Sequence, residues 1–268
     1  MDILKLKSPA KLNLHLQVLG KRNDGFHEIN SAFTLINLFD DLSFKKRPSG
    51  INLTGDLIKN NLILKAAQNL QEKYHIKNGV DIYLKKRIPI ESGLGGGSSN
   101  AATTLIALNK LWNLNLSKDE LMKIGLDLGS DVPFFIYGEN AWGKGRGENL
   151  EPIEIKDNFF ALSFPKVKIS TKLAFKSMKI FDKELSKKDF LEGKNTNTFT
   201  EYARKNYKEI DDLFLQLEKI GQPRLTGTGS TIFLTFRSEE EARDKVRIYN
   251  DLLLVKSLDR SPLIRFIE

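Results

Sequence analysis

The 268-residue chain contains no cysteine, which excludes disulfide bonds and thiolate metal sites and favours a reducing compartment. Its three histidines show no metal-binding spacing. No run approaches the roughly 18 apolar residues that a membrane span needs. The first seven residues also lack the apolar block of a signal peptide. We therefore expect a cytoplasmic protein with no membrane partner and no protein-borne metal centre.

Basic residues outnumber acidic ones by 42 − 34 = 8. Such an excess fits either nucleic acid or phosphorylated small molecules as partners. The basic residues are scattered, and the densest clusters are residues 85–87 and 187–188. The chain has no long basic tail and no stripe that alternates basic with aromatic residues. We therefore expect a polyanion pocket and no nucleic-acid partner, and an RNA-binding protein remains the alternative from another class.

The most informative stretch is the glycine-rich run from Pro89 to Ala102. Four glycines fall within five of its positions: Gly93, Gly95, Gly96 and Gly97. Glycines let a backbone turn tightly, so that its N–H groups converge on an anion. A helix predicted from Ser98 to about Leu111 would add its positive end at the same place. The run therefore predicts a phosphate-binding loop; the alternative is a flexible hinge in which Ser98 only caps the helix.

The segment from Leu12 to Val18 alternates apolar and polar residues, which predicts a half-buried strand. Lys11 and Asn13 then lie side by side on its polar face, where a site can be built. An ordinary solvent-facing strand would give the same alternation.

The turn at residues 20–27 ends in Phe26 and His27, which place an imidazole beside an aromatic ring. This pair suits a nucleobase, although a loop histidine also occurs on ordinary surfaces. Asp131 stands at a break just before Pro133, either as a site carboxylate or as a helix N-cap. Two further glycine turns, at residues 143–148 and 225–230, have no purpose that their composition alone reveals.

The order of elements predicts an α+β protein with two domains. The first half is rich in strands and contains a capping box, Ser117 with Glu120, at the start of a helix. The second half shows the order strand, helices, strand, helix, strand, with an amphipathic helix over residues 207–220. We expect domains at residues 1–155 and 156–268, with the site in the groove between them.

Several of these motifs together resemble the GHMP kinases. The glycine run resembles their ATP loop, and residues 226–230 resemble their C-terminal glycine motif. Residues 9–14, 22–27, 129–134 and 145–148 resemble the members whose acceptor is methylerythritol linked to cytidine diphosphate. The resemblance implies a ribosomal-protein-S5-like N-terminal domain that binds ATP and a ferredoxin-like C-terminal domain.

The implied reaction moves the γ-phosphoryl group of ATP, with Mg²⁺, to the 2-hydroxyl of the methylerythritol portion, a step of non-mevalonate isoprenoid synthesis. Lys11 and Asp131 match the catalytic lysine and aspartate of the family. A carboxylate against the alcohol can accept its proton, and a neighbouring lysine favours the ionised carboxylate. The partners would be small molecules only, and the protein a monomer or weak homodimer. Another GHMP kinase, acting on mevalonate or homoserine, is the nearest alternative.

The resemblance also assigns binding residues. Those for ATP are Pro89, Ile90, Glu91, Ser92, Gly93, Leu94, Gly95, Gly96, Gly97, Ser98 and Ser99. Those for the acceptor are Asn13, Phe26, His27, Phe181, Thr226, Gly227 and Gly229. Phe26 stands where the family usually has tyrosine, so the ring face remains and the hydroxyl is lost. Phe181 is expected on the opposite face of the base. Glu91 would repel phosphates unless its carboxylate points away.

Overall fold

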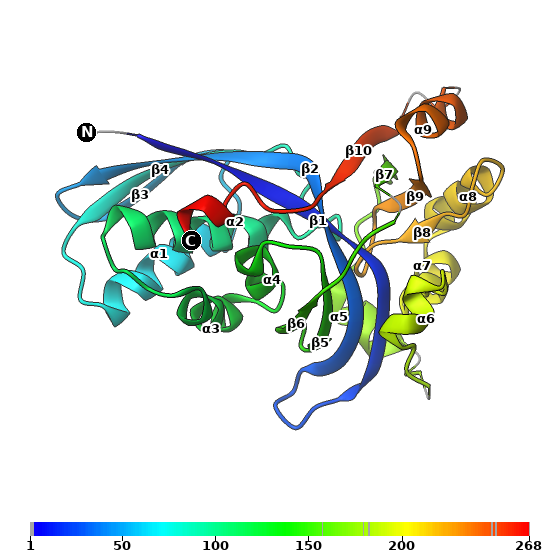
Figure 1. The fold of residues 1–268 in the computed structure, drawn as a ribbon, viewed down its shortest axis with the longest axis horizontal. Coiled ribbons are helices and arrows are strands. Elements are labelled where there is room, and N and C mark those ends of the chain that lie inside the picture. The colour runs from blue at the N-terminus through cyan, green and yellow to red at the C-terminus, as the bar shows by residue number, and fades with distance from the viewer. Residues whose placement is uncertain are drawn as a thin grey trace.

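The computed structural model describes residues 3–156, 158–178, 180–181, 183–247, 249 and 251–267. Two long antiparallel strands, β1 (Leu4–Lys21) and β2 (His27–Arg47), extend through both halves of the molecule (Figure 1). The strand predicted over residues 12–18 is the middle of β1. Its polar face is buried, with Lys11 and Asn13 each 3% exposed, because the glycine loop packs against Lys11 and Thr226 of the second half bonds the backbone of Asn13. Mixed helices and sheet confirm the α+β class.

The first half is a sheet covered by helices. Its further strands are β3 (Ile51–Gly55), β4 (Gly79–Lys85), β5 (Ala141–Gly145) and β6 (Asn149–Pro152). Its helices are α1 (Leu62–Lys73), α2 (Gly96–Leu111), α3 (Lys118–Leu128) and α4 (Val132–Tyr137). β2 pairs antiparallel with β1, β4 and β5, while β3 and β4 run parallel. Figure 1 shows α1 and α2 beneath the sheet, and α2 is buried along most of its length, which suits its apolar composition.

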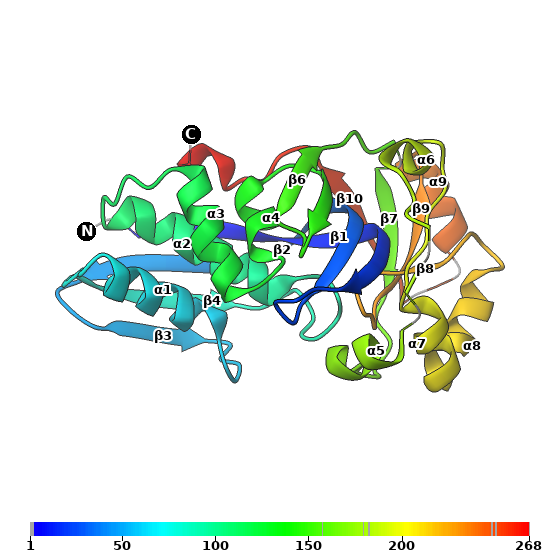
Figure 2. The ribbon, with the colours of Figure 1, turned by 90° about the horizontal axis from the view of Figure 1, so that it is seen from below.

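The second half has its own apolar core. Its strands are β7 (Phe159–Ser163), β8 (Arg224–Leu225), β9 (Ile232–Phe236) and β10 (Leu253–Leu258). Its helices are α5 (Thr171–Ser177), α6 (Lys187–Leu191), α7 (Thr200–Asn206), α8 (Lys208–Leu217) and α9 (Glu239–Val246). The helix predicted over 207–220 is α8, and it buries Ile210, Phe214 and Leu217 as its apolar stripe requires. Figure 2 shows α5, α7 and α8 gathered at the end of the molecule away from both termini.

One strand joins the two sheets. β10 pairs antiparallel with β7 through residues 253–256 and with β2 through Ser257 and Leu258. The chain then returns to the first core, where Leu263 is buried and a short 3₁₀ helix, Ile264–Phe266, follows. The domain boundary near residue 155 stays a prediction. The structure also shows that the last described residues of the chain pack on the first half.

Two predicted helix starts have different outcomes. The capping box before α3 is present, since Ser117 Oγ accepts from Glu120 N and Glu120 Oε2 accepts from Ser117 N. The start of α2 lies two residues earlier than predicted. Gly95, with a left-handed φ of 71°, is its N-cap, and Ser98 lies inside the first turn, so the interpretation of Ser98 as the cap is wrong. Among the described residues, no helix is both long and apolar enough to cross a bilayer.

A buried histidine makes the stability of the fold depend on pH. His15 stacks on Trp142, with ring centroids 5.4 Å apart, and its Nδ1 accepts from Thr196 N. Burial lowers the pKa of His15 to about 4, against a smaller opposing effect of Gln17. The unfolded chain, with a histidine pKa near 6.5, therefore binds more protons than the folded chain between these values, and stability falls as the pH drops through this window.

We expect the free energy of unfolding to fall by as much as about 3 kcal/mol between pH 6.5 and pH 4 because of His15. Urea unfolding of the wild type and His15→Gln at several pH values measures this effect. The variant should have the flatter pH profile, whereas His75→Gln, which changes an exposed histidine, should follow the wild type. Parallel profiles for His15→Gln and the wild type would contradict the prediction.

Candidate active site

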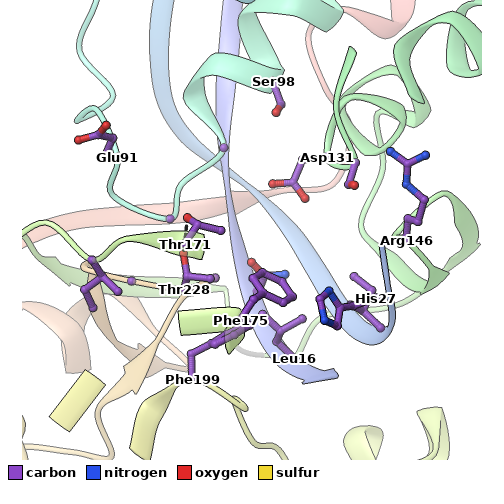
Figure 3. Close-up of a pocket in the computed structure, with 18 of the residues that line it drawn as sticks. Leu16, His27, Glu91, Ser98, Asp131, Arg146, Thr171, Phe175, Phe199 and Thr228 are labelled. Carbon is purple, nitrogen blue, oxygen red and sulfur yellow. Dashed lines mark hydrogen bonds between the residues drawn. The ribbon is translucent and has the colours of Figure 1, made fainter. Parts of the chain in front are cut away.

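A cavity of about 840 Å³ lies where the two halves meet, in the place expected for the groove (Figure 3). Its wall is formed by β1, the β1–β2 turn, the glycine loop with the start of α2, the start of α4, and residues 168–171 and 227–229. Figure 3 draws Ser98 and Asp131 in one part of the cavity and His27 with Phe175 in another. Segments far apart in the sequence thus contribute different chemistry to one space.

A buried carboxylate fixes the chain that leads into the glycine loop. Asp40, fully buried in β2, accepts from the backbone N–H groups of Arg87 at 2.7 Å and Ile88 at 2.9 Å. Its other oxygen forms an ion pair with Lys86 Nζ. Because each of these contacts satisfies the buried charge, the approach to the loop is held in one geometry.

The glycine loop is clamped between β1 and the third glycine turn. Lys11 N donates to Leu94 O at 3.0 Å on one side, and Thr231 N donates to Ser92 O at 3.2 Å on the other. Gly93 has a φ of 80°, and a Cβ at this position would lie 2.4 Å from the carbonyl oxygen of Thr226. A glycine is therefore required here both by the left-handed backbone conformation and by the close approach of the Thr226 backbone.

The start of α2 presents its free backbone N–H groups next to this loop. Of the two serines, Ser98 lines the cavity, while Ser99 Oγ is 2.7 Å from Ser8 Oγ and faces β1. The cavity wall also includes Glu91, Gly93 and Gly95. The other residues predicted for the ATP loop are not part of this wall: Pro89, Ile90, Ser92, Leu94, Gly96, Gly97 and Ser99.

The carboxylate of Glu91 is paired. Lys168 Nζ lies 2.9 Å from Glu91 Oε2, and both side chains are exposed at the cavity rim. The lysine offsets the negative charge that would otherwise repel an anion in the loop. This partner could not be predicted from the sequence, since Lys168 lies outside every motif.

Lys11 and Asp131 meet at the cavity although 120 residues separate them in the chain. Lys11 Nζ lies 3.4 Å from Asp131 Oδ2 and donates a hydrogen bond to Asn13 Oδ1. The lysine side chain is 4% exposed and the aspartate 32%, so the carboxylate reaches the open space while the ammonium group stays behind it. The predicted neighbourhood of Lys11, Asn13 and Asp131 is present in the structure.

Asp131 does not act as a helix cap. It occupies the N-cap position of α4, but its side chain accepts no capping hydrogen bond. A Cβ at Gly129, two residues earlier, would lie 3.7 Å from Ser98 Oγ, so this turn packs against the start of α2. The carboxylate is therefore left for Lys11 and for whatever enters the cavity.

Aromatic side chains line the other part of the cavity. Phe26 and His27 are there as predicted, and His27 packs on Phe175 with ring centroids 4.7 Å apart. Phe175 in turn contacts Phe199 edge to face at 4.8 Å, and both line the cavity. Desolvation, followed by the charge of Lys21, lowers the pKa of His27, so its imidazole is neutral at pH 7. A neutral imidazole can both donate and accept a hydrogen bond.

The place of Phe181 opposite the base stays a prediction. Phe181 does not line the cavity, and its backbone N–H donates to Val18 O on β1 at 3.4 Å. Phe175 on α5, which the sequence analysis did not name, packs on His27 and lines the cavity. The two phenylalanines are six residues apart in the chain.

The third glycine turn contributes Gly227, Thr228 and Gly229 to the wall. Thr226, predicted with them, is fully buried, and its Oγ1 accepts from Asn13 N at 2.9 Å. It therefore ties the turn to β1 behind the cavity. Across the described residues, no group of three or more His, Asp or Glu side chains is placed to hold a metal ion.

Comparison with known proteins places these features in context. Residues 61–139 match the model of the GHMP kinases N terminal domain, and residues 177–252 match that of the GHMP kinases C terminal. A 4-diphosphocytidyl-2-C-methyl-D-erythritol kinase from Acinetobacter baylyi is 39% identical over 278 residues, covering 99% of each chain. The enzyme of that name from Wigglesworthia glossinidia brevipalpis is 44% identical, covering 91% of this chain and 85% of its own.

Solved structures agree with the sequence comparison. A crystal structure of 4-(cytidine 5'-diphospho)-2C-methyl-D-erythritol kinase is 29% identical and has a TM-score of 0.84, covering 95% of this chain and 99% of its own. A crystal structure of mevalonate kinase is 18% identical with a TM-score of 0.72, covering 96% of this chain and 100% of its own. The second likeness shows a shared fold only.

Proposed function

Because the chain belongs to the GHMP kinase family, we propose that it transfers the γ-phosphoryl group of ATP to the 2-hydroxyl of 4-diphosphocytidyl-2-C-methyl-D-erythritol. The products are the 2-phosphate and ADP, and the reaction is a step of non-mevalonate isoprenoid synthesis. The relatives at about 40% identity over nearly the whole chain carry the name of this enzyme. The RNA-binding alternative rested on net charge and on the resemblance of the N-terminal domain to a ribosomal-protein fold, and phosphorylated small molecules as ligands account for the basic excess equally well.

The Lys11–Asp131 pair beside the glycine loop is the observation that carries the proposal. The loop and the start of α2 offer backbone N–H groups to the phosphates of ATP. Asp131 reaches the same cavity, 3.4 Å from a nearly buried ammonium group. A phosphate donor and an alcohol acceptor held between these groups would have their reacting atoms side by side.

Asp131 is the group that accepts the proton of the attacking hydroxyl as the oxygen–phosphorus bond forms. The bond from the γ-phosphorus to the oxygen bridging to the β-phosphate breaks, and ADP departs with that electron pair. Lys11 lies 3.4 Å from the carboxylate and offsets negative charge that develops on the transferred group. Asn13 accepts from Lys11 and so holds the ammonium group in place.

The aromatic part of the cavity is the site for the cytosine base. Phe26 offers a ring that is 44% exposed, and the neutral His27 offers a hydrogen bond to the base edge. Stacking of a base on an aromatic side chain is worth about 1–3 kcal/mol. Mevalonate and homoserine contain no base, so this aromatic lining favours the cytidylyl acceptor over them.

Mg²⁺ accompanies ATP in this proposal and neutralises charge on its phosphates. The residues present fit such an ion, because Mg²⁺ is typically held by one or two protein oxygens together with phosphates and water. Ser98 Oγ, in the first turn of α2 beside the glycine loop, would be one such oxygen. The dependence of activity on the ion is tested by adding a chelator.

The proposal is tested with purified protein, ATP and Mg²⁺, by following ADP formation with each acceptor separately. We expect rapid turnover with the cytidylyl acceptor and none above background with mevalonate or homoserine. The product should show a phosphate on the 2-oxygen in phosphorus-31 spectra. Preference for mevalonate or homoserine would overturn the choice of acceptor and leave the family unchanged.

A further inference from the structure

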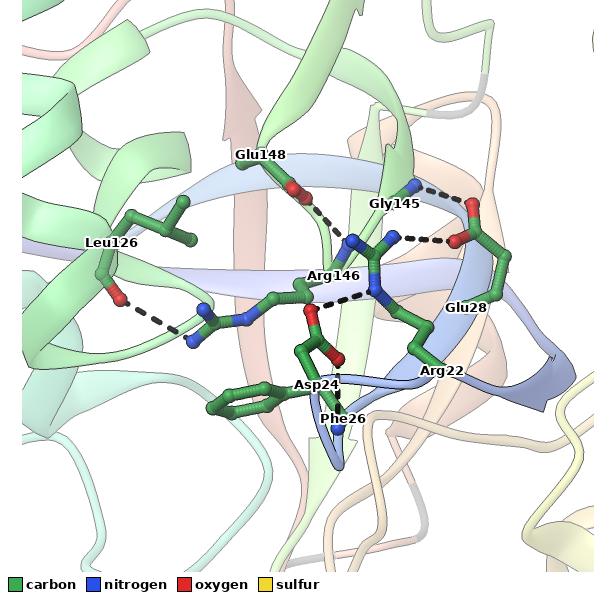
Figure 4. Close-up of polar contacts among 8 residues, drawn as sticks. All are labelled: Arg22, Asp24, Phe26, Glu28, Leu126, Gly145, Arg146 and Glu148. Atoms are coloured by element: carbon green, nitrogen blue, oxygen red, sulfur yellow. Dashed lines mark hydrogen bonds and ion pairs between the residues drawn. The ribbon is translucent and has the colours of Figure 1, made fainter.

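A second glycine turn, between β5 and β6, places an arginine on the ring of Phe26. The guanidinium carbon of Arg146 lies 3.4 Å from the centroid of that ring, which is van der Waals contact (Figure 4). At this distance the planar cation covers one face of the ring. Arg146 also lines the cavity, so the stacked pair forms part of its wall.

The turn that carries Arg146 is fixed from both ends. The backbone N–H of Arg146 donates to Glu148 Oε2, and the Nη2 of Arg146 donates to Leu126 O at 3.4 Å. Its Nε is buried and has no hydrogen-bond partner within the part of the chain that the structure describes. The Phe26 ring is thus the main surface on which this guanidinium rests.

The turn that carries Phe26 is tied to the same hairpin. Asp24 accepts from Phe26 N at 3.1 Å and from Arg22 Nε at 3.1 Å. Arg22 also pairs with Glu28, whose second oxygen accepts from Gly145 N at 3.0 Å. These bonds fix the backbone of both turns, but they leave the torsion of the Phe26 side chain undetermined.

We propose that Arg146 is a positioning residue that holds the Phe26 ring and closes one of its faces, so that a cytosine base stacks on the other. This inference rests on the proposed function. A base admitted to a single face is confined to one side of the ring, from which the rest of the acceptor extends toward Asp131. A cation held over an aromatic face contributes attraction that grows as water is excluded, and a ring fixed before binding loses less entropy when the base arrives.

A double-mutant cycle tests the contact. The variants are Arg146→Met, which keeps the stem of the side chain and removes the planar charge, Phe26→Leu, and both together. Calorimetry measures the Kd of cytidine 5'-diphosphate, and steady-state assays measure KM for the acceptor and for ATP. We expect Arg146→Met to raise the Kd of cytidine 5'-diphosphate by about fivefold to thirtyfold. The substitution should also raise KM for the acceptor and leave KM for ATP unchanged.

Coupling between the two substitutions distinguishes a positioning role of Arg146 from a direct contact between Arg146 and the ligand. In the Phe26→Leu background, Arg146→Met should cause no further loss, because the ring that it positions is gone. Arg265→Met is the matched control, since Arg265 lies 4.9 Å over Phe266 away from the cavity and should leave the Kd unchanged. Thermal unfolding of each variant shows whether it is folded.

Other outcomes overturn the inference in different ways. If the effects of the two substitutions multiply, Arg146 acts on the ligand directly, for example on its diphosphate, and does not position the ring. An unchanged Kd in folded Arg146→Met also overturns it. If the wild type binds no cytidine nucleotide at all, the proposed acceptor fails together with the inference.

Discussion

Replacing Asp131 by asparagine is expected to lower turnover by about 10²- to 10⁴-fold. The amide keeps the shape of the side chain but accepts a proton far less readily, and it loses the charge that faces Lys11 at 3.4 Å. Single-turnover measurement of ADP formation isolates this chemical step from product release. The Kd of ATP should change little, because the phosphates are held by backbone N–H groups of the glycine loop and the start of α2.

Asp127→Asn is the matched control for this substitution. Asp127 is exposed on α3, four residues before Asp131, and does not line the cavity. Its variant should turn over like the wild type. If Asp131→Asn retained near-normal turnover, the assignment of Asp131 as the proton acceptor would be wrong. The site would then act by positioning and charge alone.

Replacing Gly93 by alanine is expected to raise KM for ATP by at least about tenfold. The left-handed backbone conformation costs an alanine about 1–2 kcal/mol. In addition, its Cβ would stand 2.4 Å from Thr226 O, a backbone atom that cannot move aside without shifting the third glycine turn. Steady-state kinetics and a thermal unfolding curve measure the effects on ATP binding and on stability.

Gly97→Ala provides the comparison within the same loop. Gly97 lies in the first turn of α2, and the nearest atom to a Cβ there is Leu62 Cδ1 at 4.0 Å. Alanine keeps the backbone N–H and suits a helix better than glycine by up to about 1 kcal/mol. We expect KM for ATP to stay within about twofold. Equal losses at both positions would show that any side chain in the loop is harmful, whatever the backbone conformation.

The parts of the site that the sequence predicted are those whose chemistry is local. A few neighbouring residues are enough to recognise a glycine-rich loop, an alternating strand or an aspartate before a proline. These patterns made Lys11, Asn13, Asp131 and His27 candidates, each with an ordinary structural alternative, the resemblance assigned them to the site, and all four line the cavity. The family resemblance supplied the order in which these motifs come together, which spacing alone does not give.

The parts that the sequence did not predict depend on long-range packing. Phe175 was not named, because its place in the cavity depends on its packing against His27 and Phe199, which come from distant parts of the chain. The contact of Arg146 with Phe26 joins two turns that are 120 residues apart. The ion pair of Glu91 with Lys168 joins the two halves across the cavity in the same way.

The shared strand β10 limits how this molecule can move. β10 is hydrogen-bonded to β2 of the first half and to β7 of the second half. A hinge motion that separates the two halves would therefore break hydrogen bonds between these strands. The glycine loop with Asp131 and the residues 168–171 and 227–229, which face one another across the cavity, are therefore held in one relative arrangement.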